Sequence, residues 1–377
     1  MATLRSSTAG GDRPRPRAIT SLSRCNFLTV SGVRAGLGTV ARAASVIQVA
    51  VPANKRVIAV GDLNGAYDVL LDLLRGTGLV NRKLDWSGKR DELVQMGDLF
   101  NRGGGAADAL RLLLKLQRQA RKAGGKVTIL LGNHEVMTAL RHEGYCTEEE
   151  YLSFASAAER RAWPARVKRA MRRIIRQRPD GIVLPIAPRL EAWKIEHVPG
   201  RAALRRALGA RGTLGRALRA MPVAYVTAQT LFVHGGLVPS WARAGLDGLN
   251  QQAKECWAAA RINLWSLPKK CLFRNPSGPL WDRSLVAGGP QARRELRETL
   301  ALVGAQRMVV GHSQTASLPR GRNGRILVMA GGSLIDVDVG LSSRERASSA
   351  ALIIEGEHGY EWTPDGTHAL WTRRGLR

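Results

Sequence analysis

Five short polar clusters stand out along the chain, each containing a glycine. A lone Gly-Asp or Gly-His pair means little, because glycine is common where strands turn. Five in order supply carboxylate, amide and imidazole donors suited to two divalent metal ions, and a carboxylate such as Asp98 can bridge two cations during a phosphoryl displacement. The clusters are Gly61-Asp62-Leu63-Asn64-Gly65, Gly97-Asp98-Leu99-Phe100-Asn101-Arg102-Gly103, Gly132-Asn133-His134-Glu135, Val233-His234-Gly235-Gly236 and Val310-Gly311-His312-Ser313.

The elements that must position these clusters can be predicted from the apolar pattern. Apolar runs at 57–60, 92–96 and 127–131 alternate with helical stretches near 67–75 and 106–122, which is a βαβαβ series with parallel strands. In open α/β sheets the ligand crevice lies outside the carboxyl ends of the strands, so we expect the clusters to converge. Further strands are expected at 223–226, 231–233, 308–310, 326–329, 334–337 and 351–354, in a second sheet facing the first.

Residues 141–221 interrupt the alternation and hold 18 basic and eight acidic residues, an excess of +10. We interpret this stretch as an inserted helical cap. Within it, Val167, Ala170, Met171, Ile174 and Ile175 follow the spacing of one helix face, with arginines around the rest. A cap helix packed by this apolar stripe, with solvated arginines, is favoured over a surface for nucleic acid or membranes.

Length and composition exclude several classes of protein. A chain of 377 residues with 44% hydrophobic residues can bury a large core, which excludes a small disulfide scaffold and wholesale disorder. The formal charge of +28 comes from 47 Arg and 11 Lys, a bias that a GC-rich genome produces by itself, so charge is weak evidence for nucleic acid. The longest uncharged run, 220–242, contains two prolines and a histidine and does not resemble a bilayer span.

The cysteines and the N-terminal region bear on the compartment. Cys25, Cys146, Cys256 and Cys271 lie far apart, so free thiols are the default expectation, with pairing left open for an exported protein. Residues 1–54 are expected to be a basic extension outside a single domain at 55–377. An organellar transit peptide, an unstructured arm and a start codon placed too early all fit it. The cytoplasm is the favoured compartment, with organellar targeting or export as alternatives.

The ordered clusters resemble the calcineurin-like metallophosphoesterase superfamily, whose pattern is GDxHG, GDxxDRG, GNHE, a later His-Gly and a Gly-His. The stretches 230–237, 278–281 and 309–313 further resemble its Shewanella-like phosphoprotein phosphatases. The resemblance implies a four-layer α/β/β/α sandwich of two mixed sheets. It also implies that His134 protonates the leaving group, that Arg102 and Arg283 bind phosphate, and that two metal sites share Asp98. The first site would comprise Asp62, Asn64 and Asp98, and the second Asp98, Asn133, His234 and His312.

Two positions depart from the family pattern. Asn64 stands where the family has His, and it offers an amide oxygen in place of an imidazole nitrogen, which favours Mn or Mg over Zn or Fe in the first site. Asn101 stands where the family has the second Asp of GDxxDRG. The resemblance implies that this Asp would orient and stabilise protonated His134. An amide there can accept a hydrogen bond but carries no charge to raise the pKa of His134.

We therefore predict a metal-dependent hydrolase of phosphomonoesters, acting first of all on phosphoproteins. A nucleotide or dinucleoside polyphosphate hydrolase is the alternative substrate class, since related enzymes cleave these compounds. A catalytically impaired phosphate- or RNA-binding module is the alternative from another functional class. Integral membrane association is not expected.

Overall fold

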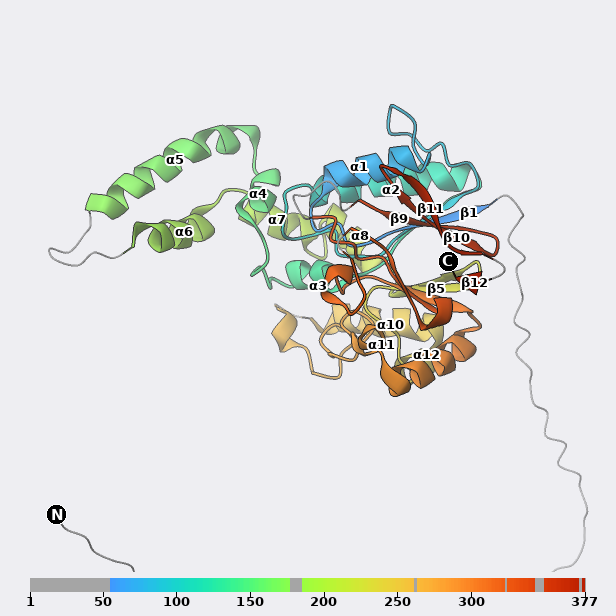
Figure 1. The fold of residues 1–377 in the computed structure, drawn as a ribbon. Helices are drawn as coiled ribbons and strands as arrows, with labels where there is room; N and C mark the ends of the chain where they lie inside the picture. Colours follow the sequence, from blue (N-terminus) through green and yellow to red (C-terminus); the bar gives the residue numbers. More distant parts are fainter. Residues whose placement is uncertain are drawn as a thin grey trace, which may run out of the picture. The chain divides into compact units, whose positions relative to one another are not determined.

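Two mixed β-sheets face each other in the computed structural model, which describes residues 55–176, 185–260, 263–322, 324–342, 349–372 and 375–376 (Figure 1). The first sheet has the strand order β12-β11-β10-β9-β1-β2-β3 and the second the order β4-β5-β6-β8-β7. The strands of the first sheet are β1 (Arg56–Val60), β2 (Glu92–Gln95), β3 (Lys126–Ile129), β9 (Ala351–Glu355), β10 (His358–Thr363), β11 (Gly366–Thr372) and β12 (Gly375–Leu376). Those of the second are β4 (Ala224–Thr227), β5 (Thr230–Val233), β6 (Arg307–Val310), β7 (Leu327–Met329) and β8 (Leu334–Asp336).

The predicted parallel core is confirmed. Strands β1, β2 and β3 are parallel neighbours, and β5, β6 and β8 are parallel in the second sheet. Figure 1 shows α1 (Tyr67–Gly76) and α2 (Ala106–Lys122) on the outer side of the first sheet and α10 (Gly245–Ala259) and α12 (Gly289–Val303) outside the second. The architecture is the expected four-layer sandwich.

One predicted strand lies in the other sheet. The run at 351–354 was expected in the second sheet, but β9 pairs antiparallel with β1, with Ile58 opposite Ile353. Strands β10, β11 and β12 then extend the first sheet in antiparallel order. The prediction was wrong because an apolar run fixes only that a strand is buried, whereas the sheet it joins depends on where the chain returns in space.

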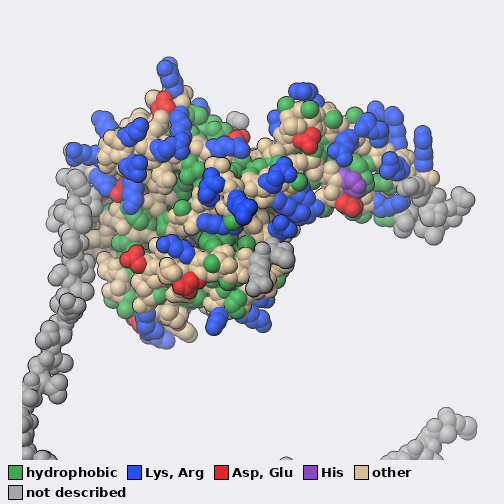
Figure 2. Space-filling model, turned by 180° about the vertical axis from the view of Figure 1, so that it is seen from behind, with side chains coloured by type: hydrophobic (Ala, Val, Ile, Leu, Met, Phe, Trp, Pro, Cys, Tyr) green, Lys and Arg blue, Asp and Glu red, His purple; other side chains and the backbone are tan. Residues whose placement is uncertain are grey.

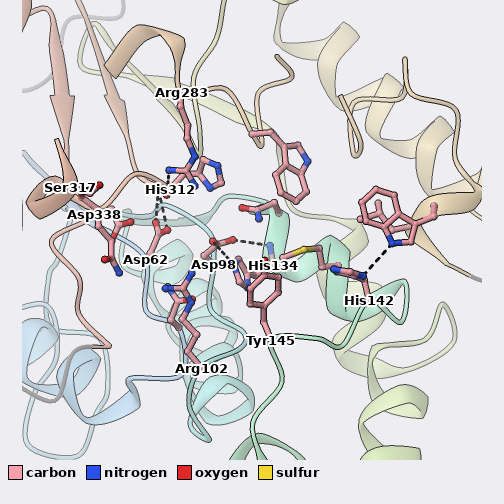
Figure 3. A pocket seen from close by; sticks show the side chains of 17 residues that line it. Asp62, Asp98, Arg102, His134, His142, Tyr145, Arg283, His312, Ser317 and Asp338 are labelled. Carbon is pink, nitrogen blue, oxygen red and sulfur yellow. Dashed lines mark hydrogen bonds and ion pairs between the residues drawn. The ribbon is translucent and has the colours of Figure 1, made fainter. Parts of the chain in front are cut away.

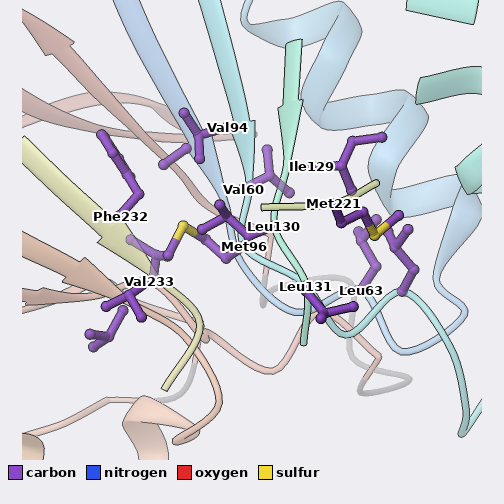
Figure 4. Packing of buried hydrophobic residues seen from close by; sticks show 14 of the residues in the cluster. Val60, Leu63, Val94, Met96, Ile129, Leu130, Leu131, Met221, Phe232 and Val233 are labelled. Atoms are coloured by element: carbon purple, nitrogen blue, oxygen red, sulfur yellow. The ribbon is translucent and has the colours of Figure 1, made fainter. Parts of the chain in front are cut away.

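Buried apolar side chains of both sheets belong to one continuous hydrophobic core (Figure 4). Val60 and Val94 come from the first sheet, Phe232 and Val233 from the second, and Met96 from the end of β2. All five are at most 1% exposed. Because this core is closely packed on both sides, the loops that leave the strand ends start from fixed positions, and those loops carry the polar clusters.

The segment between β3 and β4 is helical, as predicted for residues 141–221. Its buried Glu143 accepts hydrogen bonds from Arg201 Nε at 2.7 Å and Arg205 Nε at 2.6 Å, and the Tyr151 hydroxyl donates to it at 3.0 Å. These charge-assisted contacts hold α4 (Glu148–Ser153) against α7 (Arg201–Leu208). The helices are α3 (Asn133–Ala139), α4 (Glu148–Ser153), α5 (Ala157–Arg176), α6 (Ile186–His197), α7 (Arg201–Leu208) and α8 (Thr213–Arg219).

The predicted apolar stripe of α5 is only partly buried. Ala170 and Ile174 are buried, but Met171 and Ile175 are 43% and 40% exposed. Helix α5 packs beside α6, and Trp163 of α5 stacks on Trp193 of α6. The expected burial of the whole stripe was wrong, because α5 packs beside one helix, α6, and a single helix covers only part of the circumference of its neighbour. On the face drawn in Figure 2, Lys and Arg side chains are widely spread and few acidic side chains lie among them.

Several shorter elements connect the second sheet. They are α9 (Pro239–Ala242), α11 (Ser284–Ala287) and the single 3-10 turns Leu264–Ser266, Thr315–Ser317 and Ala330–Gly332. Cys256 and Cys271 form a disulfide, which corrects the default expectation of free thiols for this pair, because the chain after α10 returns to the helix end. Cys146 is free, while Cys25 and the expected extension at 1–54 lie outside the described residues. No helix in the described part of the chain has the length and apolarity needed to cross a membrane.

Candidate active site

The polar clusters meet at one cavity of about 450 Å³ (Figure 3). His234 is fully buried beside it, and Asn101 is fully buried behind His134. The sequence-predicted residues that line the cavity are Asp62, Asn64, Asp98, Arg102, Asn133, His134, Arg283 and His312. The structure therefore brings the whole predicted set together, from loops that follow β1, β2, β3, β5 and β6 and from the turn before α11.

Asp98, His234 and His312 form a cluster that fits a metal ion. Their ligand atoms lie within 4.8 Å of one another, and all three residues are buried. The Asn133 amide oxygen lies 2.9 Å from His234 Nε2, so it faces the same point. Two imidazoles, a carboxylate and an amide oxygen make a donor set that suits Mn, Fe or Zn.

His234 is oriented for ligation by a backbone contact. Its Nδ1 donates to the Met96 carbonyl at 2.8 Å, so the electron pair of the neutral ring lies on Nε2, which is 3.3 Å from Asp98 Oδ1. Such an outer contact fixes the ring and the tautomer of metal-binding histidines. The neighbouring His312 has a pKa lowered to about 3 by burial and by the nearby His234, so its ring is in the neutral form that binds metals.

A second group of donors gathers around Asp62. Burial, with Asp338 and Asp98 close by, raises the pKa of the Asp62 carboxyl well above its usual value. Burial also raises the pKa of Asp338 to about 6. The buried Asn64 Oδ1 has no hydrogen-bond partner among the described residues, although a buried amide oxygen normally has one. Crowded carboxylates and an orphaned amide oxygen are the surroundings that a divalent cation would relieve. The residues around Asp62 therefore fit a first metal ion that prefers oxygen ligands.

The backbone at the site is strained. Asn64, Asp98, Asn101, Arg102 and His312 all have positive φ, between 46° and 72°. Such a conformation costs of order 1 kcal/mol or more for a non-glycine residue and clusters at functional sites. Asn is among the side chains that tolerate it best, so both asparagines suit the local backbone.

Glu135 holds the loop after β2 in this conformation. The fully buried carboxylate accepts from the backbone N–H groups of Asp98 at 2.8 Å, Leu99 at 2.6 Å and Gly132 at 2.9 Å. Burial raises the pKa of Glu135 to about 7. At Gly311, an added Cβ would lie 2.4 Å from Asp62 Oδ1, so only glycine lets the loop after β6 approach that carboxylate. These contacts fix the loops that carry Asp98 and Asp62.

His134 lies at the edge of the metal cluster. Its Nδ1 is 2.6 Å from Asn101 Oδ1, and its Nε2 faces the cavity, 3.7 Å from Asp98 Oδ2. Burial lowers the pKa of His134, with Asp98 opposing and Arg102 adding to that shift. The exposed Arg102 and Arg283 side chains lie on opposite sides of the cavity (Figure 3). Arg283 Nη1 donates to the His312 carbonyl and to Ser313 Oγ, both at 2.8 Å, which fixes its guanidinium.

Aromatic side chains surround the mouth of the cavity. The Tyr145 ring lies 5.2 Å from that of His134, and Trp265 packs edge-on against His142 at 5.4 Å. Tyr145 and Trp265 are 50% and 55% exposed, an unusual state for such large rings. Trp281 closes another side, 6.0 Å from the His312 ring. The rim can therefore contact a flat ring next to a phosphate held between the arginines.

Sequence reasoning missed several residues of this site. Tyr145, Trp265, Asp338 and Glu150, which accepts a hydrogen bond from the Asn101 backbone, lie outside the five predicted clusters, and Glu135 had no predicted role. The Asp336-Val337-Asp338 run at the end of β8 was a detectable signal, because Asp338 follows this strand as the other clusters follow theirs. Glu150 is one of three consecutive glutamates on α4, and nothing in the sequence distinguishes the buried one.

Comparisons with known proteins agree with this geometry. The calcineurin-like phosphoesterase family model matches residues 55–316. Shewanella-like protein phosphatase 2 of Arabidopsis thaliana is 28% identical over 295 residues, which cover 76% of this chain and 72% of that protein. A solved cold-active protein-tyrosine phosphatase of a psychrophilic Shewanella species has a TM-score of 0.61 and 25% identity, covering 84% of this chain and 80% of its own. A symmetrical bis(5'-nucleosyl)-tetraphosphatase of Xanthomonas axonopodis is 35% identical over 92 residues, 24% of each protein.

Proposed function

This chain belongs to the calcineurin-like phosphoesterase family and is homologous to Shewanella-like protein phosphatases, and from that premise we propose that it dephosphorylates proteins with a two-metal site. One observation carries the proposal: carboxylates, imidazoles and amides from five strand ends face one cavity that two arginines flank. Such a donor set beside two guanidinium groups suits a dianionic phosphomonoester.

We assign the ligands as follows. The second site comprises Asp98, Asn133, His234 and His312, and the first comprises Asp62, Asn64 and Asp98. Asp338 is a further candidate for the first site, because it lines the same cavity and is 3% exposed. The first site then offers only oxygen donors, which favours Mn or Mg, while the imidazoles of the second also accept Fe or Zn.

The residues of the chain divide the chemistry between binding and proton transfer. When bound, the two metal ions would supply Lewis acidity and an activated water. Arg102 and Arg283 hold the phosphate oxygens, and their guanidinium forks fix its orientation. His134 Nε2 gives its proton to the leaving oxygen as the P–O bond breaks, while Asn101 Oδ1 accepts from Nδ1–H.

Phosphotyrosine is the substrate we favour among phosphoproteins. The exposed rings of Tyr145 and Trp265 at the mouth can contact a phenyl ring, whereas phosphoserine would leave them unused. A Shewanella relative of similar fold bears the name protein-tyrosine phosphatase. The tetraphosphatase match spans only 92 residues, so dinucleoside polyphosphates remain the alternative to test.

The test is a substrate panel with purified protein and Mn. We expect turnover of a phosphotyrosine peptide with kcat/KM about ten-fold or more above that for the phosphoserine peptide of the same sequence. An Arg283→Lys variant is expected to raise KM, because an ammonium group cannot hold two phosphate oxygens as a fork does. Turnover confined to diadenosine tetraphosphate would favour the nucleotide alternative. Salt-sensitive RNA binding without turnover of any phosphoester would favour the binding module.

A further inference from the structure

Asn101 is held by contacts on both ends of its amide. The side chain is fully buried. Its Oδ1 faces His134 Nδ1 at 2.6 Å, and its Nδ2 lies 3.2 Å from Glu150 Oε2 and 3.2 Å from Cys146 Sγ. An amide NH₂ has two hydrogens, and these two partners use both. The amide therefore has acceptors on its nitrogen side, and on its oxygen side it has a ring nitrogen and the Thr138 hydroxyl, which donates to Oδ1 at 3.2 Å.

Glu150 determines which way that amide points. The residue is fully buried on α4, and its Oε1 accepts from the Asn101 backbone N–H at 2.9 Å while Oε2 accepts from Asn101 Nδ2. An ionised carboxylate can only accept hydrogen bonds, so it selects the NH₂ end of the amide. A rotated amide would bring Oδ1 against the carboxylate oxygens, which is repulsive.

We propose that Glu150 is a positioning residue for His134, acting through the Asn101 amide. This inference rests on the proposed phosphatase function. With Nδ2 bound to Glu150, Oδ1 must accept from His134, so the ring carries hydrogen on Nδ1 and presents Nε2 to the cavity. The family pattern has a negative charge at position 101 itself. In this chain Glu150 supplies that charge, and it contacts position 101 from the segment inserted between β3 and β4.

An amide needs this support where a carboxylate does not. Either oxygen of an aspartate at position 101 could accept from Nδ1–H, whichever way the group turned. Only one end of an asparagine can. With the amide turned, Nδ2 would donate to Nδ1, and the ring could not hold a proton there. The imidazolium needed to give a proton from Nε2 to the leaving oxygen would then be lost, leaving a neutral ring that is a far weaker acid.

Leaving-group dependence tests the proposal. A general acid matters for a poor leaving group such as phenolate and little for a good one such as p-nitrophenolate. We expect Glu150→Gln to lower kcat on phenyl phosphate by about ten-fold or more and kcat on p-nitrophenyl phosphate by less than about three-fold, since general acid catalysis contributes roughly 100-fold or more in all. Glu149→Gln is the matched control, because that exposed neighbour on the same helix undergoes the same charge change.

Exchanging the two side chains provides the rescue. In Asn101→Asp/Glu150→Gln the carboxylate meets His134 directly, and the glutamine can donate to the new aspartate. We expect this double variant to recover phenyl phosphate turnover to within about three-fold of wild type. If Glu150→Gln lowers kcat equally on both substrates and the double variant does not recover turnover, then Glu150 has only a structural role.

A second readout needs no catalysis. Nitrogen NMR of the metal-free protein with labelled histidine reports which ring nitrogen of His134 is protonated. We expect the Nδ1–H form in wild type and a mixture in Glu150→Gln. An unchanged tautomer together with an unchanged leaving-group dependence overturns this inference and leaves the phosphatase proposal standing. Absence of turnover of every phosphoester in the wild type overturns the phosphatase proposal, and this inference with it.

Discussion

Asn101→Asp places a second buried carboxylate beside Glu150, and we predict that this single variant is less stable than the wild type at neutral pH. The new oxygen would replace Nδ2, which lies 3.2 Å from Glu150 Oε2. Two like charges at that separation repel by about 5 kcal/mol at an effective dielectric constant of about 20. Protonating one carboxyl of ordinary pKa at pH 7 costs about 4 kcal/mol. Because protonating one carboxyl costs less than the repulsion, the free energy of unfolding falls by at most about 4 kcal/mol relative to wild type.

The sign of the pH dependence follows from the proton count. The folded variant holds one proton that the unfolded chain, with carboxyls of ordinary pKa, has released at pH 7. The pKa of the folded pair is thus raised, so stability grows as pH falls and is lost as pH rises. The deficit in the free energy of unfolding of Asn101→Asp relative to wild type should therefore shrink by about 1.4 kcal/mol for each pH unit from about pH 7 down to pH 5.

Urea unfolding of metal-free protein at pH 5.5 and pH 7.5 measures this deficit. Asn101→Asp should be clearly less stable than wild type at pH 7.5 and should approach it at pH 5.5. Asn101→Asp/Glu150→Gln, which carries one carboxylate as the wild type does, should stay within about 1 kcal/mol of wild type at both. Equal stability of the single variant and wild type at pH 7.5, or a deficit that does not change with pH, would refute the reasoning.

Three further predictions concern the metals, the rim and the basic helix. Asn64→His should bind Zn more tightly relative to Mn, since imidazole suits Zn better than an amide oxygen does; metal analysis after dialysis against both ions checks this, and an unchanged ratio would contradict the assignment of Asn64. Trp265→Ala should raise KM for a phosphotyrosine peptide about three-fold or more, because the Trp265 ring is expected to contact the phenyl group. KM for the matching phosphoserine peptide should stay within about two-fold of wild type. Equal effects on the two peptides would contradict a contact between Trp265 and the phenyl group. Replacing the exposed Arg169, Arg172 and Arg173 by Gln should raise KM for anionic substrates chiefly at low salt, with kcat unchanged, because such charges steer capture; a changed kcat would contradict this.

The part of the site that lies on strand-end loops could be predicted from the sequence. A glycine followed by a polar residue marks where a buried strand stops, and parallel strands stop at the same edge. Asp62, Asp98, Asn133 and His312 were found on this ground, since their places depend on local pattern and sheet direction alone.

The rest of the site depends on contacts between distant segments. Glu150 reaches Asn101 across 49 residues, from a helix whose sequence shows only three adjacent glutamates. The position of β9 in the first sheet and the disulfide between Cys256 and Cys271 likewise depend on where the chain returns. Periodicity tells which face of an element is buried, and it carries no information about the partner that covers it.

Metal stoichiometry of wild type and Asp98→Ala, measured together with turnover, tests the central claim most directly. Asp98 is the ligand that both proposed sites share, and Asp62 serves only the first. We predict two ions per chain in wild type, loss of turnover with at most one weakly held ion in Asp98→Ala, and one retained ion in Asp62→Ala. An Asp98→Ala protein that still holds two ions and turns over p-nitrophenyl phosphate at the wild-type rate would contradict the two-metal site.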